Sequence, residues 1–337
     1  MGRRLDRLTD NQLLDLRICD LSLQIKGTRL EQRIARLYRE LERRRLRFRP
    51  HVWLSEEWFT PDGTAGFAIP FYLAHPRLIK LERAQMLEVE GAGERECMKI
   101  LRHEAGHALD NAYRLHVRRS WADTFGSYRV PYPEWYQPHP DSRDYVLNLD
   151  AWYAQAHPAE DFAETFAIWL KPGGRWRREY KDWGARRKLE YVDRLMAELK
   201  NKPPSVNSRR VVEPLCSIRT TLREHYRKKR AYYEIPWPPS FERNLYRVFS
   251  SERRRGDLPK AAQFLRRIQR ELCQIVAQGT GVHLYTINHV VRRMIVRCRQ
   301  LDLRVALPED QAKQLSIVML TMQIMQVLRT GYHRIPL

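Results

Sequence analysis

The segment His103-Glu104-Ala105-Gly106-His107 holds the residues whose types and spacing most clearly could do chemistry. In a helix, side chains four positions apart lie on one face, so His103 and His107 could bind one Zn²⁺ together, with bonds of about 2.0–2.1 Å. Glu104 would then face the open coordination position, where it could take a proton from a zinc-bound water and pass it to a leaving amine. A chain of this composition would contain such a motif by chance only roughly 0.03 times. The pattern therefore predicts a zinc site with Glu104 as the general base.

A catalytic zinc site needs a third protein ligand, and residues 156–167 (Ala-His-Pro-Ala-Glu-Asp-Phe-Ala-Glu-Thr-Phe-Ala) offer carboxylates for it. Pro158 suits the first turn of a helix, on which Glu160 and Glu164 would share one face. One carboxylate could bind the metal while the other holds a ligating histidine by its remaining N–H. Asp161 is the alternative ligand, but it is rotated by about 100° around the helix and has a shorter side chain. The residues alone leave the ligand open, with Glu160, Glu164 and Asp161 as the candidates.

These two segments together resemble a bacterial family of zinc-binding metallopeptidases, gluzincin-like proteins that combine H-E-x-x-H with a later E-D-x-A-E-T-F-A. The second segment is also similar to the zinc site of anthrax lethal factor. There a ligating Glu is followed four residues later by another Glu, and a functional Tyr precedes the ligand by seven residues. Aligned on residues 163–166, the ligand falls on Glu160 and the Tyr on Tyr153. The resemblance therefore implies Glu160 as the ligand in preference to Asp161, with Glu164 and Asp161 as supporting residues.

The resemblance covers about residues 50–170 and implies a zinc metallopeptidase, a hydrolase that acts on peptides or proteins. It also implies a role for Tyr153, whose O–H would stabilise the oxyanion of the reaction. The other interpretation of Tyr153 is a core tyrosine beside Trp152, and the sequence does not decide between them.

The elements that must position these residues follow from the apolar pattern. Thr28 and Glu31 form a capping-box pattern before a helix, and residues 51–59 and 65–73 are strand candidates. Residues 78–81 are a candidate third strand, and residues 73–80 could supply an edge strand that pairs with an extended peptide. Helices are predicted over residues 9–19, 94–115, 158–170 and 184–200. Residues 121–150, rich in Pro, Tyr and Trp, predict a long ordered loop or lid.

A linker candidate, Lys202-Pro203-Pro204-Ser205-Val206-Asn207-Ser208, separates this part from further predicted helices. Those helices cover residues 210–230, 258–277, 286–301 and 308–329, with a Pro-rich break at 235–239. We therefore expect an α+β fold with two domains. A zincin-like metallopeptidase domain, with a small sheet and the H-E-x-x-H helix, would occupy residues 1–200, and a basic, mostly α-helical domain would occupy residues 201–337.

The net charge of +21 comes mainly from the second of these parts. Residues 1–200 carry 35 basic and 30 acidic groups, whereas residues 201–337 carry 26 and 10, including runs at 227–230 and 253–255. Such cations suit a nucleic-acid or acidic protein partner, although charge runs are often only solvated helix faces. The alternative function is therefore a nucleic-acid or protein-binding scaffold with a structural or vestigial zinc site. A structural site is normally closed by four protein ligands, and the three good candidates here favour catalysis.

Cysteine usage and hydropathy give expectations about the compartment. The five cysteines are odd in number and contain no C-x-x-C pair, which argues against a disulfide framework. The N-terminus lacks the apolar stretch of a secretory signal. The longest apolar run, Leu315 to Leu328, is interrupted by polar residues and is shorter than the span of about 20 residues that a bilayer requires. We expect that run to be a buried helix and the protein to be cytoplasmic, with no membrane partner.

Overall fold

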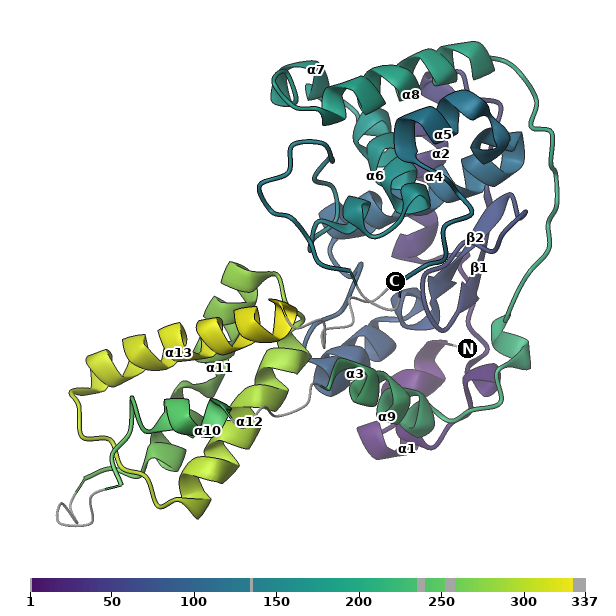
Figure 1. Ribbon diagram of the computed structural model, residues 1–337. Coiled ribbons are helices and arrows are strands. Elements are labelled where there is room, and N and C mark those ends of the chain that lie inside the picture. The colour runs from purple at the N-terminus through teal and green to yellow at the C-terminus, as the bar shows by residue number, and fades with distance from the viewer. Residues whose placement is uncertain (1, 134–135, 235–239, 252–257, 330–337) are drawn as a thin grey trace. The chain divides into compact units, whose positions relative to one another are not determined.

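The computed structural model describes residues 2–133, 136–234, 240–251 and 258–329 (Figure 1). Within these residues the chain is mostly helical and has one two-stranded parallel sheet, which is consistent with an α+β fold. The elements that precede the predicted linker are η1 (Gly2–Arg7), α1 (Asp10–Leu14), η2 (Ile18–Leu21), α2 (Arg29–Arg43), β1 (His51–Ser55), β2 (Gly66–Pro70), η3 (Phe71–Ala74), α3 (Pro76–Met86), α4 (Glu94–Tyr113), η4 (Leu115–Val117), α5 (Arg119–Phe125), η5 (Tyr153–Gln155), α6 (Pro158–Leu170), α7 (Trp176–Glu179) and α8 (Ala185–Leu199). Those that follow it are η6 (Leu215–Ser217), α9 (Leu222–Tyr233), α10 (Ser240–Leu245), α11 (Ala261–Thr280), α12 (Leu284–Gln300) and α13 (Glu309–Arg329).

The chain divides into two compact units. The first comprises Met1–Gln85 with Val89–His225, and the second comprises Met86–Glu88 with Tyr226–Leu337. Residues 201–225 belong to the first unit because they are attached to β1, where Trp53 Nε1 donates to Val212 O at 2.9 Å and Ser55 Oγ donates to Glu213 O at 2.7 Å. The predicted domains, with their boundary at residue 200, stay a prediction. The predicted Pro-rich break at 235–239 and the basic run at 253–255 lie outside the described residues.

The sheet of the first unit is small and has β2 at its centre. Strands β1 and β2 pair in parallel, from His51 opposite Gly66 to Ser55 opposite Pro70. On the other edge of β2 the chain between the strands forms one antiparallel bridge, in which Ala68 N donates to Phe59 O at 2.8 Å. This bridge fixes the next residue, Thr60, beside helix α4.

Helices α4 and α6, both predicted, pack closely side by side and carry the two motifs (Figure 1). Gly106 permits this approach, because a Cβ at that position would lie 2.9 Å from the Cα of Ala163 on α6. Any side chain there would force the helices apart, so a glycine that costs about 1 kcal/mol in an isolated helix is required by packing. Helix α6 begins with Pro158 after the cap residue His157, whose Nδ1 accepts a hydrogen bond from Ala159 N at 3.1 Å.

The predicted strand at 78–81 and the predicted edge strand at 73–80 are wrong. Residues Phe71–Ala74 form the short helix η3, and Pro76–Met86 form the helix α3. Pro76 suits a helix start, and the buried residues Leu78, Leu81 and Met86 recur with helical spacing. The strand prediction failed because a short apolar run does not distinguish the two periods.

The second unit has an apolar core between α10, α11, α12 and α13 (Figure 1). Helix α13 contains the long apolar run, but it is buried along one face only. Ala312, Leu320 and Ile324 lie in the core, whereas the exposed face carries Leu315, Val318, Met322 and Met325. The expectation of a wholly buried helix therefore holds for half of its surface. Among the described residues, none of the helices has both the length and the apolar character needed to span a bilayer.

Candidate metal centre

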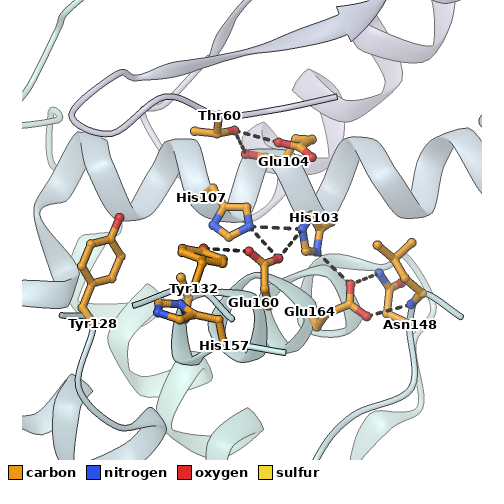
Figure 2. A network of polar contacts seen from close by, with 12 residues as sticks. Thr60, His103, Glu104, His107, Tyr128, Tyr132, Asn148, His157, Glu160 and Glu164 are labelled. Atoms are coloured by element: carbon orange, nitrogen blue, oxygen red, sulfur yellow. Dashed lines mark hydrogen bonds and ion pairs between the residues drawn. The ribbon is translucent and has the colours of Figure 1, made fainter. Parts of the chain in front are cut away.

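Three side chains from α4 and α6 converge on one point (Figure 2). The Nε2 atoms of His103 and His107 lie 3.1 Å apart, and Glu160 Oε2 lies 3.0 Å from the first and 3.1 Å from the second. His103 and Glu160 are buried, while His107 is partly open to solvent. The predicted spacing of His103 and His107 thus places both imidazoles on one face of α4, opposite Glu160 of α6.

Glu164, one turn after Glu160 on α6, holds His103 from behind. The Nδ1–H of His103 donates to Glu164 Oε1 at 2.8 Å, and the same carboxylate accepts from Asn148 Nδ2 at 2.8 Å and from Leu149 N at 2.7 Å. Because Glu164 is fully buried, these bonds fix both its orientation and the tautomer of His103. The Nε2 lone pair of His103 is therefore directed at the convergence point (Figure 2).

This donor set fits a zinc ion. Two imidazole nitrogens and a carboxylate oxygen are zinc ligands, and ligands of tetrahedral zinc lie about 3.4 Å apart, close to the separations here. Among the described residues, no fourth His, Cys, Asp or Glu belongs to the group. Within the described part of the chain, the group thus supplies three of the four ligands that tetrahedral zinc takes.

The electrostatics of the cluster favour a bound cation. Burial would raise the pKa of Glu160, but the charge of His107 and the hydrogen bonds with both histidines hold that pKa well below its usual value. Burial would likewise lower the pKa of His103, whereas its bonds to Glu160 and Glu164 hold its pKa well above the ordinary one. The two carboxylates thus supply negative charge that a proton or a metal ion at the convergence point would neutralise.

Glu104 follows His103 on α4, and its carboxylate is turned towards Thr60 beside the sheet. Its Oε2 accepts a hydrogen bond from Thr60 Oγ1 at 2.8 Å, and in Figure 2 both residues lie above His107, with Glu160 below it. Burial raises the pKa of Glu104, while the charges of His103 and His107 and the Thr60 bond oppose that shift. A carboxylate with a raised pKa is suited to accept and return a proton near neutral pH.

The structure also places the two remaining predicted residues. Tyr153 lies in η5, and the centroid of its ring is 5.5 Å from that of His103. Burial, together with the charge of Glu160, raises the pKa of Tyr153 well above the usual value. Asp161 instead faces α8, where Lys188 Nζ donates to its Oδ2 at 2.6 Å. Tyr153 therefore lies beside the cluster, and Asp161 lies outside it.

Three residues at the site were missed by sequence reasoning. They are Thr60, Asn148 and Tyr132, whose hydroxyl donates to Glu160 Oε1 at 2.8 Å. Tyr132 and Asn148 come from the segment that the sequence identifies only as a Pro-, Tyr- and Trp-rich loop. Its composition signalled a lid, but no motif indicated which of its tyrosines would reach the cluster.

Residues 80–173 match a family model described as "Putative zinc-binding metallo-peptidase". This range includes the three residues of the cluster and the four other predicted site residues, Glu104, Tyr153, Asp161 and Glu164. The matched range contains α4 and α6 in full. No curated protein and no solved structure matches the chain. The family description and the His-His-Glu group on α4 and α6 both point to a zinc-binding protein.

Proposed function

We propose that this protein, whose residues 80–173 are similar to zinc-binding metallopeptidases, is a zinc-dependent peptidase with His103, His107 and Glu160 as its metal ligands. The single observation that carries the proposal is the convergence of their three ligand atoms within 3.1 Å of one another. The peptide or protein substrate follows from the family description. A set of two histidines and one glutamate, with no fourth ligand in the described group, supports catalysis by a gluzincin-like site over the alternative of a structural one.

Glu104 is the general base in this proposal. A zinc ion at the site would polarise the scissile carbonyl and lower the pKa of the attacking water. Glu104 would take the proton of that water and deliver it to the leaving amine. Its buried position and raised pKa suit both transfers, and the hydrogen bond from Thr60 orients the carboxylate.

Tyr153 is the candidate that stabilises the oxyanion. Its raised pKa keeps the phenol protonated, so it can donate a hydrogen bond to developing negative charge. Glu164 positions His103, and Asp161 supports α6 from outside through its pair with Lys188. Binding of nucleic acid or of an acidic protein by residues 201–337 stays a prediction, as does the cytoplasmic location.

The test combines zinc content with peptide hydrolysis. The 337-residue chain should bind one zinc ion and hydrolyse members of a mixed peptide library. Glu104→Gln should retain the zinc ion but lose about 10²–10⁴-fold in rate, because it removes the base without removing a ligand. Glu96→Gln is the matched control, since Glu96 is exposed on the same helix and its loss should leave the rate unchanged.

Two outcomes would overturn the proposal in different ways. A protein that binds no zinc would rule out the metal centre. Hydrolysis that survives Glu104→Gln at the wild-type rate would rule out the assigned base while leaving the metal centre intact.

A further inference from the structure

A second contact to Glu160 comes from residues 126–133, which we call the Tyr132 segment. The two oxygens of this carboxylate are used differently: Oε2 faces the two histidine nitrogens, and Oε1 accepts the hydroxyl of Tyr132 at 2.8 Å. A donor on one oxygen restricts rotation of the carboxylate about its last bond. It therefore helps to keep the other oxygen directed at the convergence point (Figure 2).

The orientation of Tyr132 is set by contacts that do not involve Glu160. Its ring stacks on His157, with centroids 3.9 Å apart and planes 15° from parallel. His157 in turn donates its Nε2–H to Val130 O at 2.7 Å and caps α6 through Nδ1. The Tyr132 segment is thus attached to the start of α6, one turn before the candidate ligand.

Tyr132 lies at the surface, unlike the other support of the cluster. The Tyr132 residue is 48% exposed, and its hydroxyl reaches inward to the buried Glu160. By contrast, Glu164 lies fully buried behind His103. The cluster therefore has one support inside the core and one on a surface segment.

We propose that Tyr132 is a positioning residue for Glu160, and that zinc binding and the closed position of the Tyr132 segment stabilise each other. The inference rests on the proposed zinc site and deepens it. Reciprocity follows from thermodynamic linkage: if the closed segment strengthens zinc binding by some factor, zinc strengthens closure by the same factor. The access of solvent to the metal centre is then regulated by the segment that also tunes metal affinity.

The experiment compares two tyrosines of the same segment. Tyr132→Phe removes the hydroxyl that reaches Glu160 and keeps the ring on His157. Tyr128→Phe is the matched control, because Tyr128 donates to Asp62 Oδ1 at 2.8 Å and stacks on His116, away from the cluster. Zinc dissociation constants are measured on the full chain by competition with a chelator. We expect an increase of about 10-fold for Tyr132→Phe and no change for Tyr128→Phe.

Hydrogen exchange supplies a second measurement, which a purely structural role of Tyr132 would leave unchanged. In the wild type and in Tyr128→Phe, zinc should slow amide exchange in peptides that cover residues 126–133. In Tyr132→Phe that zinc-dependent protection should fall by the same factor as the affinity. Tyr132→Leu, which also removes the ring from His157, should exchange rapidly with or without zinc.

The outcomes separate this inference from the function on which it rests. A wild-type protein that binds no zinc overturns both. A wild-type protein that binds zinc, with Tyr132→Phe binding it equally tightly, overturns the role of Tyr132 and leaves the zinc site standing. Weaker zinc binding without any zinc-dependent protection of the segment would overturn the coupling.

Discussion

The two units of the molecule use charge in opposite ways. The first unit buries many ionisable side chains, among them Glu40, Arg102, Asp161 and the residues of the metal centre. The described part of the second unit buries no Asp, Glu, Lys, Arg or His, and its buried polar residues are Thr286, Asn288, Ser316 and Gln323. Within the described residues, the interior of the second unit therefore holds no charged side chain, although most of the net positive charge lies in residues 201–337.

This difference shows what a buried charge is for in this chain. A buried ion must be paired or it costs several kcal/mol, so each pair in the first unit fixes the position of two side chains. Glu164 fixes His103, and Lys188 fixes Asp161, along the same helix α6. In its described part, the second unit defines its interior by apolar packing and by hydrogen bonds between neutral groups, such as the one that Gln269 donates to Asn288.

The largest effect is expected at the pair between Arg102 and Glu40, which links α4 to α2. Arg102 Nε and NH2 donate to the two Glu40 oxygens at 2.7 Å and 2.9 Å, and both residues are buried. Arg102→Met leaves Glu40 with the half-exposed Arg36 as its remaining ion-pair partner and should lower the free energy of unfolding by about 3–5 kcal/mol. Urea unfolding followed by tryptophan fluorescence reports this unit, because eight of the nine tryptophans precede residue 200.

Arg36→Met is the control, since it removes the exposed partner of the same Glu40 and should cost less than about 1 kcal/mol. The double variant Glu40→Leu/Arg102→Met should regain most of the loss, because it removes both charges together. Equal effects for Arg36→Met and Arg102→Met would show that burial does not set the strength of these pairs.

The sequence predicted the parts of the site that lie on regular helices. The spacing of His103 and His107, and of Glu160 and Glu164, translates directly into shared faces because helical geometry is local. Thr60, Tyr132 and Asn148 could not be found in this way. They reach the centre from irregular segments, whose paths depend on contacts with the rest of the fold. The contact of Asp161 with Lys188 on α8 could not be found from the sequence either, because it joins two helices far apart in the chain.

The length of the apolar pattern also explains which elements of the fold the sequence predicted. The helices α4, α6 and α8 follow the predicted ranges closely because each has a long apolar period. The strand predicted at 78–81 failed because four apolar positions are too few to show a period. The sequence also did not predict the exposed face of α13, because apolar residues on both sides of a helix are typical of a fully buried helix.

The next largest effect is expected from a substitution in the apolar core of the second unit. Leu320 is fully buried on α13, and Met322, two residues later, is 61% exposed. Leu320→Ala should lower the free energy of unfolding by about 2–4 kcal/mol through lost contacts and a cavity. Met322→Ala should change it by less than about 0.5 kcal/mol. Far-UV circular dichroism during urea unfolding measures both. A large loss in Met322→Ala would mean that the exposed face is covered in solution.

A smaller effect is expected where a buried charge of the first unit supports the metal centre. Glu164→Gln weakens the acceptor of His103 Nδ1–H and should reduce zinc affinity about 10–100-fold, or by about 1.4–2.7 kcal/mol. Asp161→Asn, three residues earlier on α6, should leave zinc affinity unchanged while it disturbs the pair with Lys188. Chelator competition distinguishes them. Equal losses in both variants would mean that α6 responds as a whole and that Glu164 has no specific role.

The smallest effect contrasts one histidine from each unit. The hydrogen bond from His116 to Asp110, together with the charge of that carboxylate, raises the pKa of His116, whereas burial lowers the pKa of His289. The His116 contribution to stability should therefore be complete below about pH 6.5 and be lost as the pH rises through its raised pKa. His289 should behave oppositely, because below about pH 6.5 the unfolded state binds the proton more readily and the second unit is destabilised. Each contribution should be about 1 kcal/mol or less, since both rings are partly exposed. A pH titration of the imidazole carbon–proton signals by NMR, assigned with His116→Gln and His289→Gln, should place the His116 midpoint above that of His289. The reverse order would show that the acidic partners of the first unit do not outweigh burial.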